Sequence, residues 1–165
     1  RNTKMAIRNI VQEGDEVLAK QCRKVTDFNP RLHQLLDDMK DTLRKADGAG
    51  LAAPQVGVLR ACAIVVLEDG SYLEIVNPTI VEASGMQEGP EGCLSVPGRF
   101  GIVMRPNKVK ITAQDRNGEP FTYEAEGFTA RAFCHEIDHL SGHLFTELVS
   151  EYIDPEEYYS DGGEN

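Results

Sequence analysis

Hydrophobic residues recur at helical spacing in two segments of the chain. The first segment, residues 29–46, carries one apolar stripe, which is formed by Leu32, Leu35, Leu36, Met39 and Leu43. Asn29 suits the N-cap position and Pro30 the first helical position, so an amphipathic helix is expected here. Residues 128–141 are apolar on almost every side, which is typical of a helix buried between other elements.

Runs rich in β-branched residues predict strands between these two helices. The runs are Cys62–Leu67, Tyr72–Val76, Val109–Ala113 and Phe121–Ala125. Asp69-Gly70 joins the first two runs and Asn117-Gly118 the last two, which indicates hairpins. Strands joined by hairpins are antiparallel.

Glycine and proline mark the segments that are predicted to lie outside these strands. Residues 48–57 and 82–92 are expected to be loops, and Cys93–Val96 is expected to be a short extended stretch ended by Pro97-Gly98. With the elements above, this pattern predicts an α+β fold in which antiparallel β-sheets pack around a central helix.

Length and charge narrow the class of protein. A chain of 165 residues suits a single domain spanning residues 1–165. Its 17 basic and 27 acidic residues give a net charge of −10, which repels phosphate backbones and argues against nucleic acid as a direct partner. No Lys or Arg follows Arg131, so residues 147–165 form an acidic C-terminal tail that is expected to be solvated and partly frayed.

The chain shows no sign of membrane insertion or secretion. No apolar run approaches the ~20 residues that cross a bilayer, and the first residues lack the apolar stretch of a secretory signal. Met5 is a candidate natural start, with residues 1–4 as an addition. The four cysteines, Cys22, Cys62, Cys93 and Cys134, form no CxxC pair, so free thiols in a reducing cytoplasm are expected.

The segment His135-Glu136-Ile137-Asp138-His139 is the strongest chemical signal in the chain. Two histidines four residues apart on a helix present both imidazoles on one face, within reach of a single metal ion. The glutamate after the first histidine can then move protons to and from water at the metal. The segment therefore predicts metal-assisted hydrolysis, and a buried helix with two hydrogen-bonded histidines is the alternative.

A third metal ligand must come from elsewhere, because a catalytic metal usually takes three protein ligands and keeps one position open for water. In the extended motif HExxHxxGxxH a histidine follows, but Phe145 stands at that position and cannot bind a metal. Cys93 is a candidate, because Gly92 lets the backbone turn close to a metal and a metal ionises a thiol; a small buried hydrophobe is the alternative. Cys134 points away around the helix and is expected in the core, and His143 lies just past the helix end.

Three segments together resemble the peptide deformylase family. They are Gly48-Ala49-Gly50-Leu51-Ala52-Ala53-Pro54-Gln55, Glu91-Gly92-Cys93-Leu94-Ser95 and the histidine motif. They occur in the family's order, and the similarity runs from about Met5 to Phe145. The resemblance implies antiparallel sheets around a central metal-binding helix. It also implies the family's activity, which is hydrolytic removal of the N-formyl group from polypeptides that start with formylmethionine, with release of formate.

The resemblance further implies a role for each residue of the site. Cys93, His135 and His139 would hold one divalent metal ion, and Glu136 would carry the proton from water to the leaving amine. The residues that would stabilise the oxyanion are Gln55, through its side chain, and Leu94, through its backbone N–H.

Other residues would contact the substrate or support the metal ligands. The residues expected to bind the peptide and its methionine side chain are Gly48, Ala49, Gly50, Phe128 and Ala132, together with His135. Glu91 and Arg105 would pair and orient a ligand histidine, with a surface ion pair as the alternative. The chain departs from the family at Ala49, where isoleucine or valine is common, and at Cys134, where glutamine is common.

The family's metal is usually ferrous iron, with zinc, nickel or cobalt as substitutes, and two histidines and a cysteine alone do not decide between them. N-formylated nascent peptides are the expected partners of a monomer of the bacterial type, in the cytoplasm or an organelle. At most a transient ribosome contact is expected, because the tail is acidic and some relatives dock through a basic segment. Two other functions stay open: a different metallohydrolase, such as an endopeptidase, and a structural metal module closed by a fourth protein ligand.

Overall fold

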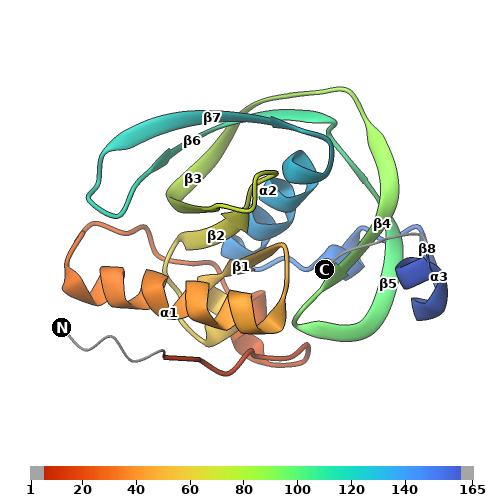
Figure 1. Cartoon of the computed structure of the whole chain (residues 1–165), viewed down its shortest axis with the longest axis horizontal. Helices are drawn as coiled ribbons and strands as arrows, with labels where there is room; N and C mark the ends of the chain where they lie inside the picture. Colours follow the sequence, from red (N-terminus) through yellow and green to blue (C-terminus); the bar gives the residue numbers. More distant parts are fainter. Residues whose placement is uncertain (1–5, 161–165) are drawn as a thin grey trace.

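The computed structural model describes residues 6–160, and Figure 1 shows how their helices and strands are arranged. The candidate start at Met5 and the acidic residues Asp161 and Glu164 lie outside the described residues. Helices and two antiparallel sheets make up the described part of the chain. The predicted class, α+β with antiparallel sheets, is confirmed.

The larger sheet has the strand order β1-β2-β3-β6-β7, and all neighbouring strands are antiparallel. Its strands are β1 (Gly50–Ala52), β2 (Cys62–Val66), β3 (Tyr72–Ser84), β6 (Lys108–Gln114) and β7 (Pro120–Glu126). Both predicted hairpins are present, since β2 pairs with β3 and β6 pairs with β7. Gly70 and Gly118 adopt φ = +85° in the two turns, a conformation that glycine reaches without a steric penalty.

The smaller sheet has the order β4-β5-β8 and was largely missed by sequence analysis. Its strands are β4 (Gln87–Cys93), β5 (Val96–Arg105) and β8 (Glu151–Ile153). The predicted loop over residues 82–92 was wrong, because β3 continues to Ser84 and β4 begins at Gln87. The predicted end at Pro97-Gly98 was also wrong, because β5 runs through it. Backbone pairing of β4 with β5 forms these strands although their glycines and prolines hide the usual alternation.

The helices begin and end close to the predicted positions. They are α1 (Pro30–Ala46), α2 (Gly127–Leu140) and α3 (Pro155–Ser160), with 3₁₀ turns η1 (Glu16–Ala19), η2 (Ala53–Val56) and η3 (Phe145–Glu147). The Asn29 side chain caps α1 by accepting a hydrogen bond from the Leu32 N–H. Asp47 adopts the left-handed conformation at the end of α1. The predicted loop over residues 48–57 was wrong in part, since it contains β1 and η2.

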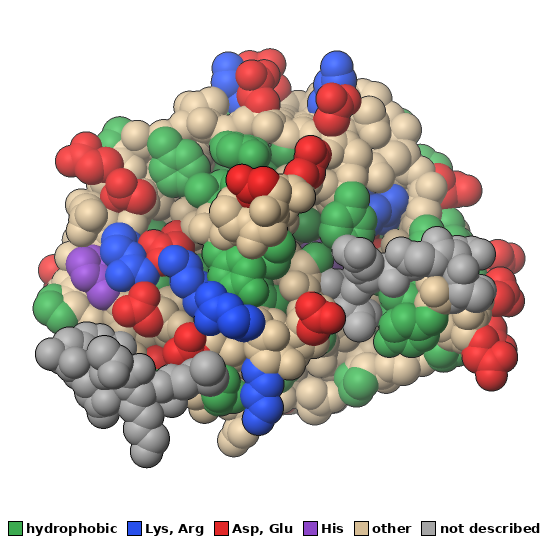
Figure 2. Space-filling model, in the orientation of Figure 1, with side chains coloured by type: hydrophobic (Ala, Val, Ile, Leu, Met, Phe, Trp, Pro, Cys, Tyr) green, Lys and Arg blue, Asp and Glu red, His purple; other side chains and the backbone are tan. Residues whose placement is uncertain are grey.

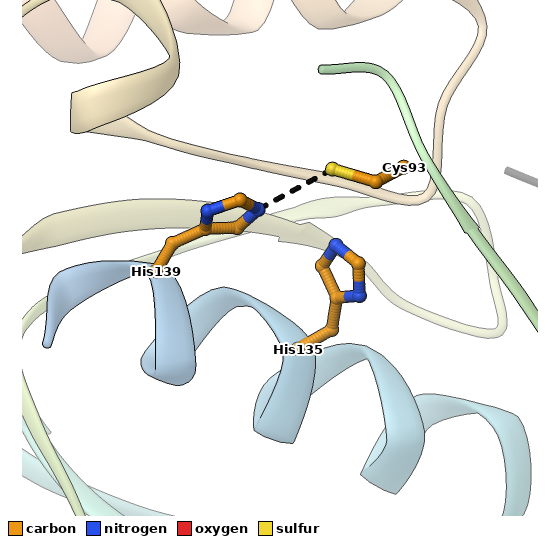
Figure 3. A group of neighbouring side chains, drawn as sticks. All are labelled: Cys93, His135 and His139. Carbon is orange, nitrogen blue, oxygen red and sulfur yellow. Dashed lines mark hydrogen bonds between the residues drawn. The ribbon is translucent and has the colours of Figure 1, made fainter. Parts of the chain in front are cut away.

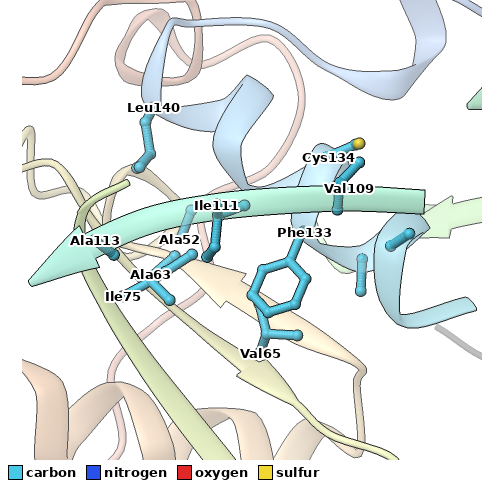
Figure 4. Packing of buried hydrophobic residues seen from close by; sticks show 12 residues of the cluster. Ala52, Ala63, Val65, Ile75, Val109, Ile111, Ala113, Phe133, Cys134 and Leu140 are labelled. Carbon is cyan, nitrogen blue, oxygen red and sulfur yellow. The ribbon is translucent and has the colours of Figure 1, made fainter. Parts of the chain in front are cut away.

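The two faces of the larger sheet are covered by different helices. Alternate residues of a strand face opposite sides, so Val65 packs in the cluster around Phe133 of α2 (Figure 4), while Ile64 packs in the cluster that contains Met39 of α1. Phe133, Ile64 and Met39 are fully buried. Helix α2 therefore lies between the larger sheet on one side and the smaller sheet on the other. This packing fixes the side chains along the helix.

The predicted fraying of the tail was wrong for the last described residues, although their acidic side chains are exposed as predicted. β8 pairs with β5, with Ile153 opposite Phe100. Tyr158 is only 1% exposed, and its ring stacks on Phe100 with 3.9 Å between centroids. The aromatic residues that lie among the acidic ones thus supply enough apolar surface to hold this segment against the sheet.

The surface carries the acidic character that the composition predicts. Acidic side chains stand at several places around the face in Figure 2, with basic side chains among them. Within residues 6–160, no helix combines the length and the hydropathy that a membrane span requires.

Candidate active site

Cys93, His135 and His139 meet in the fold although 46 residues separate Cys93 from His139. Helix α2 presents both imidazoles, and the end of β4 brings the thiol to them (Figure 3). One ligand atom from each residue lies within 4.8 Å of the other two, and Cys93 Sγ is 3.4 Å from His139 Nε2. A sulfur and a nitrogen bound to one tetrahedral metal ion stand about 3.6 Å apart. The three residues therefore fit a single divalent ion.

Within residues 6–160 the cluster offers three candidate ligands. Cys134 of α2 packs in the core cluster that contains Phe133, as predicted. His143 is exposed and its Nδ1 lies 3.0 Å from Glu147 Oε1. Three ligands leave a coordination position open, as a catalytic metal needs, whereas a structural site is closed by a fourth.

Burial and charge set different proton affinities for the two histidines. Burial lowers the pKa of His139 well below its ordinary value, which favours the neutral imidazole that binds metals. Burial also acts to lower the pKa of His135, but interactions with Cys93 and Glu136 outweigh it and raise that pKa. An environment that favours a proton on His135 also favours a divalent cation beside it.

Glu136 is a buried carboxylate that follows His135 of the cluster. It is 3% exposed, and its Oε1 has no hydrogen-bond partner among the residues that the structure describes. An unpaired buried oxygen is costly, and a water molecule at the ligand cluster would give it a partner. Burial raises the pKa of Glu136 to about 7, which suits a group that takes and returns a proton near neutral pH.

The Gln55 amide is fixed at both ends beside the cluster. Its Oε1 accepts a hydrogen bond from the Ala52 N–H at 2.9 Å, and its Nε2 donates to Ser95 Oγ at 3.1 Å. The same Nε2 lies 3.6 Å from Cys93 Sγ. The short turn η2 places Gln55, and the turn between β4 and β5 places Leu94 and Ser95. A preorganised N–H donor therefore points at the site, which is what an oxyanion requires.

Glu91 and Arg105 form a buried pair rather than a surface pair. Arg105 donates to both carboxylate oxygens of Glu91, at 3.1 and 2.6 Å. Glu91 Oε2 lies 2.6 Å from Nδ1 of His135, which leaves Nε2 of that ring for a metal. Burial acts to raise the pKa of Glu91, but hydrogen bonds with His135 and Arg105 outweigh it and hold the pKa well below its ordinary value. Glu91 is therefore an ionised acceptor that can orient the His135 ring.

One pocket connects these groups with the predicted substrate-binding residues. Its lining includes Ala49, Gly50, Gln55, Glu91, Cys93, Leu94, Phe128, Ala132, His135 and Glu136. Gly48 lies beside the pocket, where an added methyl group would stand 2.8 Å from Leu94 Cδ1. Phe128 is 46% exposed and so forms part of the rim. Arg131 also lines this pocket and was not predicted, although it lies one helical turn after Phe128.

A Gly50→Ala substitution is expected to lower kcat by about 10²-fold, because displacing a catalytic group by about 1 Å can cost that much. A methyl group at this position would lie 2.5 Å from Glu136 Oε2 and 2.9 Å from Glu136 Cγ. Glu136 must therefore move. Steady-state turnover of the formylated peptide that the resemblance implies as substrate checks kcat, and metal analysis and thermal melting check that the variant is loaded and folded. A loaded, folded variant with unchanged kcat would contradict the close packing of Glu136 on this glycine.

Comparison with known proteins agrees with this geometry. Residues 7–153 match the family model described as polypeptide deformylase. A peptide deformylase from Caldicellulosiruptor bescii is 52% identical over 153 residues, which are 93% of this chain and 92% of that protein. Peptide deformylase 1 of Bacillus subtilis is 48% identical over 93% of this chain and 96% of its own length. The crystal structure of a peptide deformylase from Legionella pneumophila superposes with a TM-score of 0.85 at 44% identity and covers 88% of this chain and 87% of that chain. The chain belongs to the peptide deformylase family.

Proposed function

We propose that Cys93, His135 and His139 hold the divalent metal ion with which this member of the family removes the N-formyl group from newly made polypeptides. The observation that carries the proposal is the meeting of one thiol and two α2 imidazoles in a pocket that also holds Glu136 and Gln55. Three ligands in reach of one another, a buried carboxylate and a fixed amide donor are the parts that metal-assisted amide hydrolysis needs.

The residues of the site take distinct parts in the reaction. A bound divalent ion supplies Lewis-acid chemistry, which polarises the formyl carbonyl and lowers the pKa of water. Glu136 accepts the proton of the attacking water and passes it to the amine nitrogen as the bond to the formyl carbon breaks. Gln55 Nε2 and the Leu94 backbone N–H donate to the oxyanion of the tetrahedral species. The products are formate and a free amino terminus.

The substrate would lie along the pocket that Gly50 and Phe128 border. Gly48 and Gly50 leave room for an extended peptide beside the β1 segment, and Ala49, Phe128 and Ala132 offer an apolar surface to the methionine side chain. Two of these residues, Ala49 and Ala132, are small, so the pocket depends on other side chains for its shape.

The proposal extends to the cellular setting. Ferrous iron is the metal we expect in the cell, in a monomer that acts in the cytoplasm, with at most a transient ribosome contact. The bacterial relatives support the setting. The four cysteines are free, which suits a reducing compartment. We also expect residues 1–165 to act as one catalytic domain.

Formate release from formyl-Met-Ala-Ser tests the function directly. The protein is purified anaerobically, loaded with iron or nickel, and compared with the same sample after chelation. We expect release from the loaded sample and loss of release after chelation. No release from a sample with one metal per chain would reject the deformylase assignment, and cleavage of unformylated peptides instead would favour a different metallohydrolase.

A Gln55→Leu substitution is expected to lower kcat by about 10²–10³-fold, the usual effect of removing one oxyanion donor. Leucine keeps the approximate size of the buried side chain but cannot donate a hydrogen bond. Gln55 is not a member of the cluster, and its one hydrogen bond to the cluster is the long one to Cys93, so metal content should stay near that of the wild type. A kcat within about threefold of the wild type would show that Gln55 does not stabilise the transition state.

A further inference from the structure

Arg131 is a buried cation in the wall of the substrate pocket. The pocket face of α2 consists of Phe128, Arg131, Ala132, His135 and Glu136, which are spaced at intervals of three and four residues, as one face of a helix requires. Arg131 is 5% exposed. It is the one Lys or Arg in the lining among the described residues. A buried arginine needs partners for its charge, so its contacts show what it does.

The Arg131 head group is directed at Glu91. Its Nη1 donates to Glu91 Oε1 at 2.9 Å and to the Val103 carbonyl at 3.1 Å. Its Nη2 approaches Gln87 Oε1 at 3.4 Å. An arginine fixes geometry through several donors in a plane, and here the donors join α2 to both strands of the β4–β5 hairpin.

Glu91 is consequently held by two arginines as well as by its contact with His135. Oε1 accepts from Arg131 and Arg105, and Oε2 accepts from Arg105 and meets Nδ1 of His135. Arg105 also donates to Asp138 at 2.7 Å. The cluster thus contains two cations and two carboxylates, of which Asp138 is partly exposed and the other three groups are buried. Each carboxylate oxygen of Glu91 therefore has two polar contacts, which together fix the plane of the carboxylate.

From this geometry we infer that Arg131 is a positioning residue, which locks the Glu91 carboxylate in the orientation that holds the His135 ring for the metal. The inference rests on the proposed role of His135 as a ligand. Without Arg131, Arg105 still pairs with Glu91, but Oε1 loses its second donor and the carboxylate can turn. Partners that contact a metal ligand directly, as Glu91 contacts His135, typically contribute about 10–100-fold to metal affinity or activity. Arg131 acts through Glu91, so its loss is expected to cost about the lower end of that range. The aliphatic stem of Arg131 would meanwhile remain a wall of the pocket.

Arg131→Met and Arg131→Lys separate this role from simple packing. Methionine keeps an unbranched apolar stem and removes the guanidinium, so we expect nickel affinity and kcat each to fall about 10-fold, the lower end of the range for a direct partner of a ligand, with KM for formyl-Met-Ala-Ser within about threefold. Lysine keeps a cation that can donate to Glu91, and should restore most of both losses. Arg116→Met is the matched control, because Arg116 pairs with Glu74 and Asp37, neither of which lines the pocket.

The experiment measures nickel affinity by chelator competition, kcat and KM by formate release, and folding by thermal melting. The inference is supported when Arg131→Met loses affinity and kcat and Arg116→Met keeps both. It is overturned when Arg131→Met binds nickel as the wild type does, or when it only melts earlier and keeps kcat per bound metal. A wild type that binds no nickel would overturn the proposed site as well, so the two failures are distinct. If Arg131→Met does not fold, Arg131→Gln replaces it with the same expected direction.

Discussion

Replacing Glu136 with alanine is expected to lower kcat by about 10³-fold, within the usual range for removal of a general acid–base group. The carboxylate is buried, its Oε1 has no partner among residues 6–160, and its pKa lies at about 7 because of burial. It is therefore the group best placed to take a proton from water and return it to the amine. Glu136 is not one of the three clustered ligands, so the variant should keep its metal.

Saturating formyl-Met-Ala-Ser with formate detection gives kcat, and metal analysis of the same sample gives the loading. Glu88→Ala is the matched control, because Glu88 is an exposed carboxylate of β4, the strand that carries Cys93. The control should keep its activity. A metal-loaded Glu136→Ala variant with near wild-type kcat would remove Glu136 from the mechanism and leave proton transfer to another group.

The elements that were predicted correctly are those with a clear local pattern of apolar, capping and turn residues. Helix α1 shows one apolar stripe and a capping asparagine, and the two hairpins of the larger sheet show β-branched runs around Asp69-Gly70 and Asn117-Gly118. These patterns are local, so they can be recognised without knowing which elements pack against them.

The smaller sheet could not be predicted in the same way. β4 has the sequence Gln-Glu-Gly-Pro-Glu-Gly-Cys, which contains neither alternation nor β-branched residues. It becomes a strand because β5 pairs with it. β8 likewise depends on β5, a strand about 50 residues earlier in the chain. Both are tertiary effects that override local preference.

The candidate site likewise contains residues that local sequence predicts and residues that only the folded chain reveals. The histidine pair follows from helical spacing, whereas the residues alone left Cys93 open as a ligand or a buried hydrophobe. The fold brings its thiol 3.4 Å from His139. Arg131 was missed for a different reason: its position on the pocket face of α2 follows from spacing, but a charge within an apolar helix has no predictable partner until β4 and β5 are placed. Its partner Glu91 and the Arg105–Asp138 pair appear only in the folded chain.

Replacing Cys93 with alanine is expected to abolish tight metal binding and, with it, formate release. The substitution leaves two imidazoles on α2 and removes the one member of the cluster that comes from the β4 strand. Removal of partners behind a metal ligand already costs about 10–100-fold in affinity, so loss of a ligand itself should weaken binding by more than about 100-fold. Chelator competition with nickel measures the affinity, and metal analysis after gel filtration measures what remains bound.

Cys134→Ala is the matched control for this substitution. Cys134 is also buried and directly precedes His135, but its side chain packs in the core cluster and is not part of the pocket lining. It should bind nickel with wild-type affinity, even if loss of the buried thiol lowers the melting temperature. Because the two cysteines are alike in chemistry and burial, only their positions relative to the imidazoles separate them. Full nickel binding by Cys93→Ala, or equal loss in both variants, would therefore show that the thiol of Cys93 is not a ligand and that the ion, if bound, is held in another way.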